Sequence, residues 1–360
     1  MGKLRIGIVG TGGIANGKHM PSLKKLSNVE MVAFCDIVEE RAVKAANQYG
    51  AEGSKVYTDY RELLKDETID IVHVCTPNYN HAEIAIAAME AGKHVMSEKP
   101  MAITSKEARA MVEASKRTGK KLTVGYNNRF RPDSQHLKKV CESGQLGEIY
   151  YAKAHAIRRR AVPTWGVFLD EEKQGGGPLI DIGTHALDLT LWMMDNYKPV
   201  SVTGSVYHKL GSRANSANAW GPWDPEKFTV EDSAFGYIKM ENGATIVLES
   251  SWALNTLDVK EAKTTLCGTE GGADMEDGLR LNGESFSRMW EQEVNLKSGG
   301  VAFFSGTAEK DADLEMRVWV DAILNDTEPV VKAEQALVVT EILEAIYESA
   351  KTGKTVYLNQ

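Results

Sequence analysis

The stretch Arg5-Ile6-Gly7-Ile8-Val9-Gly10-Thr11-Gly12-Gly13-Ile14-Ala15 decides the fold that we predict for this 360-residue chain. A short apolar run that ends in glycine and leads into helical residues indicates a buried strand followed by a helix. The spacing Gly10-x-Gly12-x-x-Ala15 is typical of a turn that binds a dinucleotide. The first glycine allows the tight turn, the second lets the backbone approach a pyrophosphate, and the small third residue lets the helix pack closely on the sheet. Glycines often serve only turns, so the neighbouring residues must support this interpretation.

An acidic residue supports it. Met31–Asp36 reads as a second strand, and its last residue, Asp36, is placed to accept hydrogen bonds from both hydroxyls of an adenosine ribose. The same carboxylate would repel a 2′-phosphate, and no arginine follows in Ile37-Val38-Glu39. We therefore predict NAD rather than NADP as the cofactor. The alternative is that Asp36 only caps the following helix.

Strands and helices alternate through the first third of the chain. Apolar strands at 69–75, 93–97 and 121–124 are separated by helices at 82–91 and 104–118, which predicts βαβ units and a parallel sheet. After Phe130 several strands are joined by turns such as Glu241-Asn242-Gly243, and helices at 310–324 and 334–351 close the chain. This half predicts a mostly antiparallel sheet with helices on one face. We expect a dinucleotide-binding domain at 1–128 and a second domain at 129–360.

Composition excludes several classes of protein. The net charge of −8 argues against a general nucleic-acid binder, and the absence of a run of about 18 apolar residues argues against a membrane span. The four cysteines are far apart and form no CxxC pair, and no ligand cluster has metal spacing, so we expect reduced thiols and no metal. The first residues run directly into a strand without a signal-peptide pattern, so we expect a cytoplasmic protein.

Charged residues end one of the predicted strands. Lys93–Ser97 is followed by Glu98-Lys99-Pro100, and the carboxyl ends of parallel strands face the crevice in which α/β sheets bind ligands. Lys99 is therefore a candidate active-site residue. Taken alone, a Glu-Lys pair would more often lie on the surface.

A second constellation lies in Gly175–Asp188. Three consecutive glycines, Gly175–Gly177, precede a helix that carries Asp181 and His185, and residues four apart share one helix face. An imidazole oriented by a carboxylate suits proton transfer to or from a hydroxyl. The alternative is a structural histidine.

These motifs, in this order, resemble those of the Gfo/Idh/MocA oxidoreductases over essentially the whole chain. The matching segments are Gly10–Ala15, Thr76-Pro77-Asn78 with His81, Ala91–Pro100, Gly125-Tyr126-Asn127 with Arg129-Phe130, and Gly175–Asp188. The resemblance implies an α/β protein with an N-terminal Rossmann domain and a C-terminal α+β domain whose open-faced sheet forms a homo-oligomer, a dimer or tetramer. It also implies a cis peptide before Pro100.

The resemblance further implies roles for single residues. Lys99 would hydrogen-bond the reacting hydroxyl, His185 would take its proton, and Asp181 would orient and assist; descriptions of the family differ on whether lysine or histidine is the nearer base. The cofactor contacts expected on this basis, together with the glycine loop, are Gly10, Gly12, Gly13, Ile14, Asp36, Thr76, Asn78, His81, Glu98, Lys99 and Asn127.

Arginines and a tryptophan precede the glycine loop of the second half. Arg158, Arg159 and Trp165 suit hydrogen bonding to and stacking on a sugar, although a solvated basic patch is the alternative. The aromatic segment Trp220–Asp224 is open to interpretation as a lid or an oligomer contact. These regions resemble the branch of the family that acts on sugars and glycosides, which implies oxidation of a ring hydroxyl, often at C3.

The resulting hypothesis is an NAD-dependent dehydrogenase that acts on a secondary ring hydroxyl of a sugar, at C3 of a glucoside. The alternatives are an inositol dehydrogenase, a glycosidase that uses NAD transiently, and a non-catalytic NAD-binding sensor. The presence of Lys99, Asp181 and His185 argues against the sensor.

Overall fold

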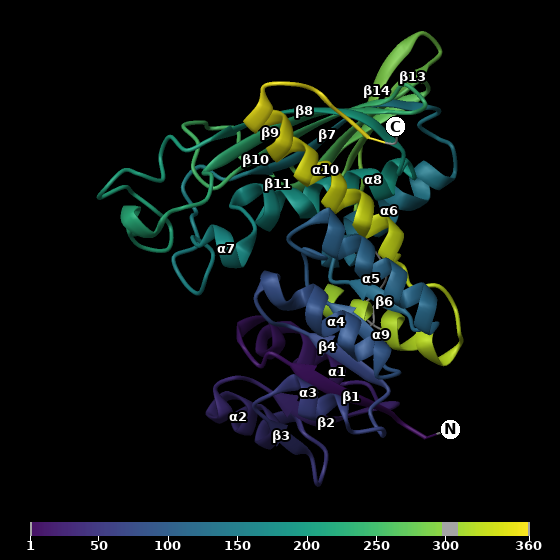
Figure 1. The fold of residues 1–360 in the computed structure, drawn as a ribbon. Helices are drawn as coiled ribbons and strands as arrows, with labels where there is room; N and C mark the ends of the chain where they lie inside the picture. The colour runs from purple at the N-terminus through teal and green to yellow at the C-terminus, as the bar shows by residue number, and fades with distance from the viewer. Residues whose placement is uncertain (1, 297–308, 359–360) are drawn as a thin grey trace. The chain divides into compact units, whose positions relative to one another are not determined.

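The computed structural model describes residues 2–296 and 309–358, which group into two compact units (Figure 1). Among the described residues, unit 1 comprises 2–127 and 309–337, and unit 2 comprises 128–296 and 338–358. The predicted domain division, 1–128 and 129–360, stays a prediction; in the structure the late segment 309–337 groups with unit 1.

Unit 1 is built on a six-stranded sheet in the order β3-β2-β1-β4-β5-β6, with every pairing parallel. This is the order of a doubly wound dinucleotide-binding fold, in which the carboxyl ends of the strands form the ligand crevice. The strands are β1 (Leu4–Val9), β2 (Val29–Cys35), β3 (Lys55–Tyr57), β4 (Ile71–Val74), β5 (His94–Ser97) and β6 (Leu122–Val124). The helices are α1 (Met20–Leu23), α2 (Glu39–Tyr49), α3 (Tyr60–Leu64), α4 (His81–Glu90), α5 (Ser105–Thr118) and α9 (Asp311–Leu324).

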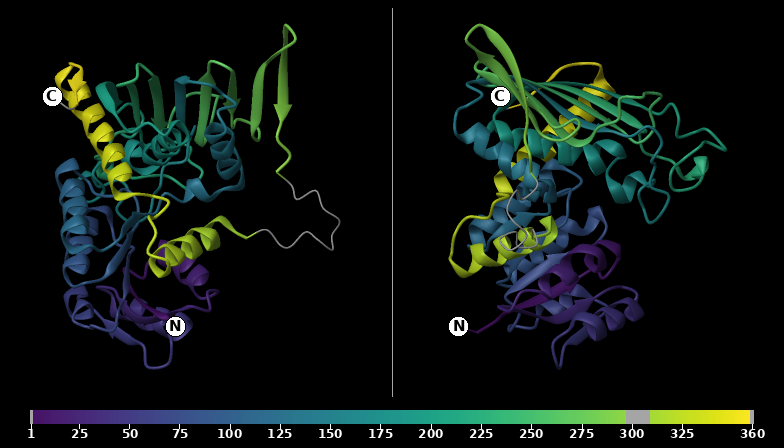
Figure 2. Two further views of the ribbon diagram at one scale, coloured as in Figure 1. Left: turned by 90° about the vertical axis from the view of Figure 1, so that its right-hand side faces the viewer. Right: turned by 180° about the vertical axis from the view of Figure 1, so that it is seen from behind.

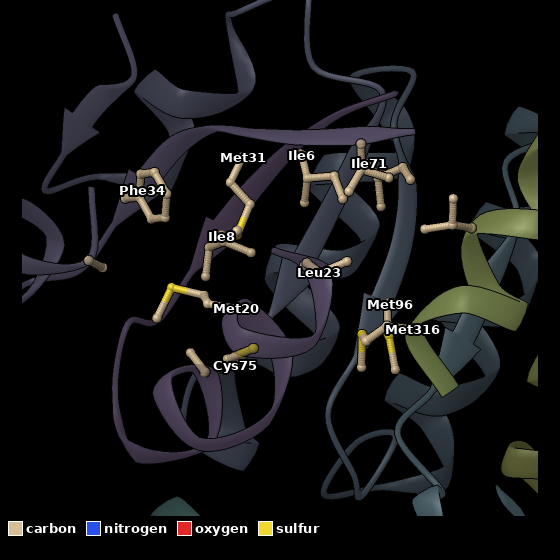
Figure 3. Packing of buried hydrophobic residues seen from close by; sticks show 14 of the residues in the cluster. Ile6, Ile8, Met20, Leu23, Met31, Phe34, Ile71, Cys75, Met96 and Met316 are labelled. Carbon is tan, nitrogen blue, oxygen red and sulfur yellow. The ribbon is translucent and has the colours of Figure 1, made fainter. Parts of the chain in front are cut away.

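The core of unit 1 joins both ends of its sequence. Ile6 and Ile8 of β1 are fully buried, and Met316 of α9 belongs to the same apolar cluster (Figure 3). Trp319 and Val320 of α9 are also buried in it, so Met316 and these residues form one stripe at helical spacing. This apolar stripe explains why α9 groups with unit 1.

Unit 2 carries a nine-stranded sheet in the order β14-β13-β12-β11-β7-β10-β9-β8-β15. The β10–β7 pair is parallel and the other pairs are antiparallel. The strands are β7 (Ile149–Ile157), β8 (Pro199–Tyr207), β9 (Ser233–Met240), β10 (Thr245–Ser251), β11 (Glu261–Gly268), β12 (Gly271–Asp274), β13 (Arg280–Ser285), β14 (Arg288–Glu293) and β15 (Val356–Tyr357). The prediction of a mostly antiparallel second sheet is confirmed.

Helices cover one face of this sheet. Figure 1 shows α6 (Pro132–Glu142), α8 (Thr184–Met194) and α10 (Ala333–Thr352) on the same side. A Cβ atom on Gly204 or Gly236 would lie 2.7 or 2.5 Å from the side chain of Ile346, so α10 packs directly against β8 and β9. Tyr237 follows Gly236 on β9, so its side chain points to the other face, where it is about half exposed.

One hairpin differs from the sequence prediction. β13 and β14 form a hairpin at the edge of the sheet, and the sequence did not indicate its second strand (Figure 2). The sequence Arg-Met-Trp-Glu-Gln-Glu of β14 is polar and largely exposed, so it lacks the buried alternation by which strands are recognised. Among the described helices, none has the length and apolarity that crossing a bilayer requires.

Candidate active site

The glycine loop after β1 leaves an open cradle. Gly10 has φ +87°, and a Cβ atom there would lie 2.6 Å from the carbonyl oxygen of Cys75, so a side chain does not fit. At Gly12 and Gly13, in contrast, no heavy atom lies within 4 Å of the Cβ position. The backbone of these two glycines is therefore accessible, as close approach of a pyrophosphate requires. The residues present fit a bound dinucleotide.

Asp36 ties this loop to the end of β2. Its Oδ2 accepts hydrogen bonds from the backbone N–H of Thr11 at 3.0 Å and from the Thr11 hydroxyl at 3.2 Å. Its Oδ1 accepts one from the N–H of Val38 at 2.9 Å. A carboxylate offers about four acceptor positions, so about one remains for a ribose hydroxyl. Asp36 therefore shapes the loop itself, in addition to its predicted contact with the cofactor.

Glu98 lies in a buried network of charges that the sequence analysis missed. Its Oε1 is 2.8 Å from Nζ of Lys18 and 2.8 Å from Nε2 of His19, both on the helix after the glycine loop. Lys18 also lies 3.1 Å from Oε2 of Glu315 on α9. Buried charges are tolerated only with partners of this kind. The network joins the glycine-loop helix, the end of β5 and α9.

The network shifts the pKa values of its two carboxyl groups, Glu98 and Glu315, in opposite directions. Burial by itself raises the pKa of Glu98, but Lys18 and His19 hold it well below its ordinary value. Burial raises the pKa of Glu315 to about 7, because Lys18 offsets the desolvation only in part. Glu98 is thus charged at neutral pH, whereas the raised pKa of Glu315 makes protonation of this carboxyl much easier.

A second histidine extends the network. The Nδ1 atoms of His19 and His73 are 2.9 Å apart, and burial lowers the pKa of both rings. Glu98 accepts from Nε2 of His19, so in a neutral ring Nδ1 of His19 accepts and His73 must donate. The hydrogen bonds therefore run in one direction, from His73 through His19 to Glu98.

His81 connects the loop after β4 with the Lys99–Pro100 segment. Its Nδ1 lies 2.8 Å from the carbonyl oxygen of Pro100, and its Nε2 lies 2.9 Å from that of Thr76. The ring is fully buried, and burial lowers its pKa. The Lys99–Pro100 peptide is cis, as expected. His81 therefore holds the backbone next to Lys99.

In unit 2, Asp181 and His185 lie on different turns of one continuous helical segment. Asp181 is in the π-helical turn η4 (Leu179–Gly183), and His185 is at the start of α8. The sequence analysis expected a regular helix here; π turns occur frequently at functional sites. Asp181 is buried, and its Oδ2 accepts a hydrogen bond from Nε1 of the fully buried Trp252 at 3.0 Å.

A carboxylate clamps the glycine segment that precedes this turn. Glu231 accepts hydrogen bonds from the N–H groups of Gly177 at 2.7 Å and Leu179 at 3.0 Å, and from the hydroxyl of Tyr347 at 2.9 Å. A Cβ atom on Gly176 would lie 2.0 Å from that hydroxyl. Burial raises the pKa of Glu231, and the three donors offset this in part. Sequence analysis missed Glu231 and Tyr347, since neither stands near the motif in sequence.

The comparisons with known proteins agree with these features. Residues 4–126 match the model of the oxidoreductase family's NAD-binding Rossmann fold, and residues 138–358 match that of its C-terminal alpha/beta domain. The chain belongs to the Gfo/Idh/MocA oxidoreductase family. It is accordingly an NAD-dependent oxidoreductase, and the predictions of the family, of the fold class and of NAD as cofactor are confirmed.

Several relatives are named enzymes. The chain is 35% identical to D-glucoside 3-dehydrogenase of Escherichia coli K12, over 99% of this chain and 97% of that one. It is 31% identical to inositol 2-dehydrogenase of Salmonella typhimurium, over 55% of this chain and 57% of that one. Among solved structures, an oxidoreductase domain protein of Kribbella flavida superposes with a TM-score of 0.85 at 25% identity, with 100% of both chains covered. An NAD-binding protein of Listeria innocua superposes with a TM-score of 0.75 at 28% identity, covering 99% of this chain and 97% of that one.

The remaining family motif residues lie on both units. Asn78 is buried in the short 3₁₀ turn after β4, and Asn127 begins the turn η3 (Asn127–Phe130). Arg129, in the same motif as Asn127, pairs with Asp188 at 2.6 Å, and both are fully buried. This buried ion pair connects η3 with α8. Lys99, Glu98 and Asp36 belong to unit 1, and Asp181 and His185 belong to unit 2.

The predicted substrate residues differ in exposure. Arg158 binds Glu261 with two nitrogens and donates to the carbonyl oxygen of Ala161, so its guanidinium is largely engaged within unit 2. Arg159 is exposed, and the Trp165 ring is 52% exposed. Within the described residues, no group of three or more potential ligands is arranged to hold a metal ion.

Proposed function

We propose that this family member oxidises the C3 hydroxyl of a D-glucoside to a ketone and transfers the hydride to NAD. The observation that carries this proposal is the 35% identity, over 99% of the chain, to a D-glucoside 3-dehydrogenase. The relatives named as inositol dehydrogenases match only about half of the chain, so we rank an inositol as the second substrate class.

The proposed chemistry assigns one task to each motif residue. His185 takes the proton of the hydroxyl, Lys99 hydrogen-bonds its oxygen, and Asp181 orients and assists His185. The bound NAD would supply the hydride acceptor. Trp252 donates a hydrogen bond to Asp181, and Arg158 lies 3.8 Å from the same oxygen, so two side chains hold the carboxyl group in place, as an orienting role requires. We also propose that the cofactor site is formed by the glycine loop together with Asp36, Thr76, Asn78, His81, Glu98 and Asn127. The buried side chains of Glu98 and His81 act by positioning the loops of this site.

The test is the absorbance of NADH at 340 nm with NAD and either methyl D-glucoside or myo-inositol, followed by NMR of the product. A 3-keto-glucoside is the expected product. NADH formed only from inositol would overturn the assignment to glucosides. Cofactor binding without turnover of either compound would favour the NAD-binding sensor, and release of the aglycone without net NADH would favour the glycosidase.

Two variants test the catalytic assignments. Lys99→Ala and His185→Ala should each lower kcat by roughly 10²–10⁴, the usual contribution of a positioned acid or base, with little change in NAD affinity. His136→Ala, at an exposed position on α6, is the matched control for histidine removal and should keep full activity. Near-normal turnover of either catalytic variant would remove that residue from the mechanism.

We propose further that the enzyme acts in the cytoplasm as a homo-oligomer. The open face of the nine-stranded sheet, on which Tyr237 is about half exposed, is the surface that we assign to subunit contact. The measurement is sedimentation equilibrium of the full chain and of Tyr237→Glu. A monomer in both cases would reject the assignment.

A further inference from the structure

A ring of side-chain contacts connects the buried Asp181 with two half-exposed tryptophans, Trp165 and Trp220. On one side, Trp252 donates to Asp181 at 3.0 Å and lies edge to face with Phe168, with ring centroids 6.3 Å apart. Phe168 in turn lies edge to face with Trp165 at 5.8 Å.

The other side returns to Asp181 through Arg158. Trp165 and Trp220 are in contact, with centroids 5.0 Å apart and planes at 76°. The Arg158 guanidinium carbon lies 5.2 Å from the centre of Trp220, and its Nη1 lies 3.8 Å from Oδ2 of Asp181. Trp220 is thus separated from the predicted catalytic carboxylate by one side chain.

Exposure increases along this set. Trp252 is fully buried, whereas Trp165 and Trp220 are 52% and 44% exposed. The two indoles are in contact and both are about half exposed, so they present one continuous apolar surface to which a ligand can bind. We call the exposed surfaces of Trp165 and Trp220 the tryptophan corner.

The backbone that carries the tryptophan corner is already held in place. The side chain of Asn218 donates to the carbonyl oxygen of Val162 at 2.9 Å and accepts from the N–H of Val162 at 2.8 Å. The hydroxyl of Thr164 donates to the carbonyl oxygen of Trp220 at 3.0 Å. The two loops are therefore joined before any substrate binds, which lowers the entropy cost of binding on them.

We propose that the tryptophan corner is the aglycone subsite of this enzyme and that it selects glucosides with a flat aromatic aglycone. The proposal rests on the proposed oxidation of glucosides, because Asp181 marks where the sugar reacts. Two perpendicular indoles let an aryl ring stack on one while its face meets the edge of the other, and both arrangements are favourable.

The polar groups beside the corner also favour an aryl group over a second sugar. The side chains of Asn218 and Thr164 form hydrogen bonds within the loops, so they are engaged before a ligand arrives. A second sugar would need new partners for its hydroxyls, whereas an aryl ring needs only apolar surface.

The experiment compares kcat/KM for phenyl and methyl glucosides of the same anomeric configuration, using the full chain with NAD. Trp220→Ala should lower the ratio of the phenyl to the methyl value by roughly 3- to 10-fold, the loss expected for one aromatic contact. Trp220→Phe should restore most of the ratio. Phe286→Ala, which removes a 99% exposed ring at the β13–β14 hairpin, is the control and should leave the ratio unchanged.

The outcomes separate the subsite from the proposed function. An unchanged ratio in Trp220→Ala, or an equal loss with both glucosides, would overturn the aglycone subsite while glucoside oxidation stood. In a parallel assay, Trp220→Ala could lower the ratio of the cellobiose value to the methyl glucoside value while the phenyl-to-methyl ratio stays unchanged. That result would assign the corner to a sugar aglycone and overturn the aryl preference. No NADH from any glucoside with the unmodified enzyme would reject both proposals.

Discussion

Removing one hydroxyl, in Tyr347→Phe, tests whether Glu231 positions the turn that carries Asp181, a proposed catalytic residue. The hydroxyl donates to Glu231 at 2.9 Å, and Glu231 is only 2% exposed. A hydrogen bond to a charged group contributes roughly 1.5–3 kcal/mol, and two backbone donors remain to Glu231, so we expect a loss of about 2 kcal/mol. For a unit of this size that loss lowers Tm by roughly 4–8 °C.

The variant should also change catalysis, because Glu231 fixes the N–H groups of Gly177 and Leu179 at the start of the turn that carries Asp181. We expect kcat for glucoside oxidation to fall by about tenfold while the Kd for NAD is unchanged, since misplacing a catalytic group affects the rate more than cofactor binding. Thermal unfolding, steady-state kinetics and cofactor titration measure the three quantities.

The surface pair of Tyr60 and Glu83 provides the matched control, because it is the same hydrogen bond at an exposed position. Tyr60→Phe should change the free energy of unfolding by less than about 0.5 kcal/mol and leave kcat unaltered. Equal effects of the two substitutions on Tm would refute the clamp. A loss of stability in Tyr347→Phe with normal kcat would restrict Glu231 and Tyr347 to a structural role.

Two further predictions concern unit 1. Asp36→Asn keeps an oxygen acceptor for Thr11 but removes the charge, so it should weaken NAD binding about tenfold and NADP binding much less; equal losses in fluorescence titrations with the two cofactors would contradict this. Folding raises the pKa of Glu315 from 4.5 to about 7, so between these pH values the folded chain binds more protons than the unfolded chain. The Glu315 contribution to the free energy of unfolding therefore falls as the pH rises through this range, by up to about 3 kcal/mol. Above pH 7 it stays constant. Glu315→Gln should therefore gain stability relative to the unmodified chain between pH 5 and pH 7.5. If urea denaturation gave the same difference in unfolding free energy between the two proteins at both pH values, the raised pKa of Glu315 would be contradicted.

Local patterns account for what was predictable about the fold. The glycine spacing after β1 and the apolar strands of unit 1 need only neighbouring residues to be recognised, and the parallel sheet follows from their alternation with helices. The hairpin of β13 and β14 was not recognised in full, because its second strand is polar on both faces. The π turn that carries Asp181 was also unforeseen, since its sequence reads as an ordinary helix.

The sequence by itself determined the family and the cofactor, and it predicts Lys99, Asp181 and His185 as catalytic residues, because each motif is a short run whose chemistry depends on its own spacing. Only the tertiary structure decided what holds these residues. Lys18 and Glu98 are 80 residues apart, and Glu231 and Tyr347 are 116 apart. A buried charge requires a partner with the opposite charge or a matching donor, but any segment that the fold brings close can supply it. No local pattern identifies that segment, so the supporting contacts emerge only when the chain is folded.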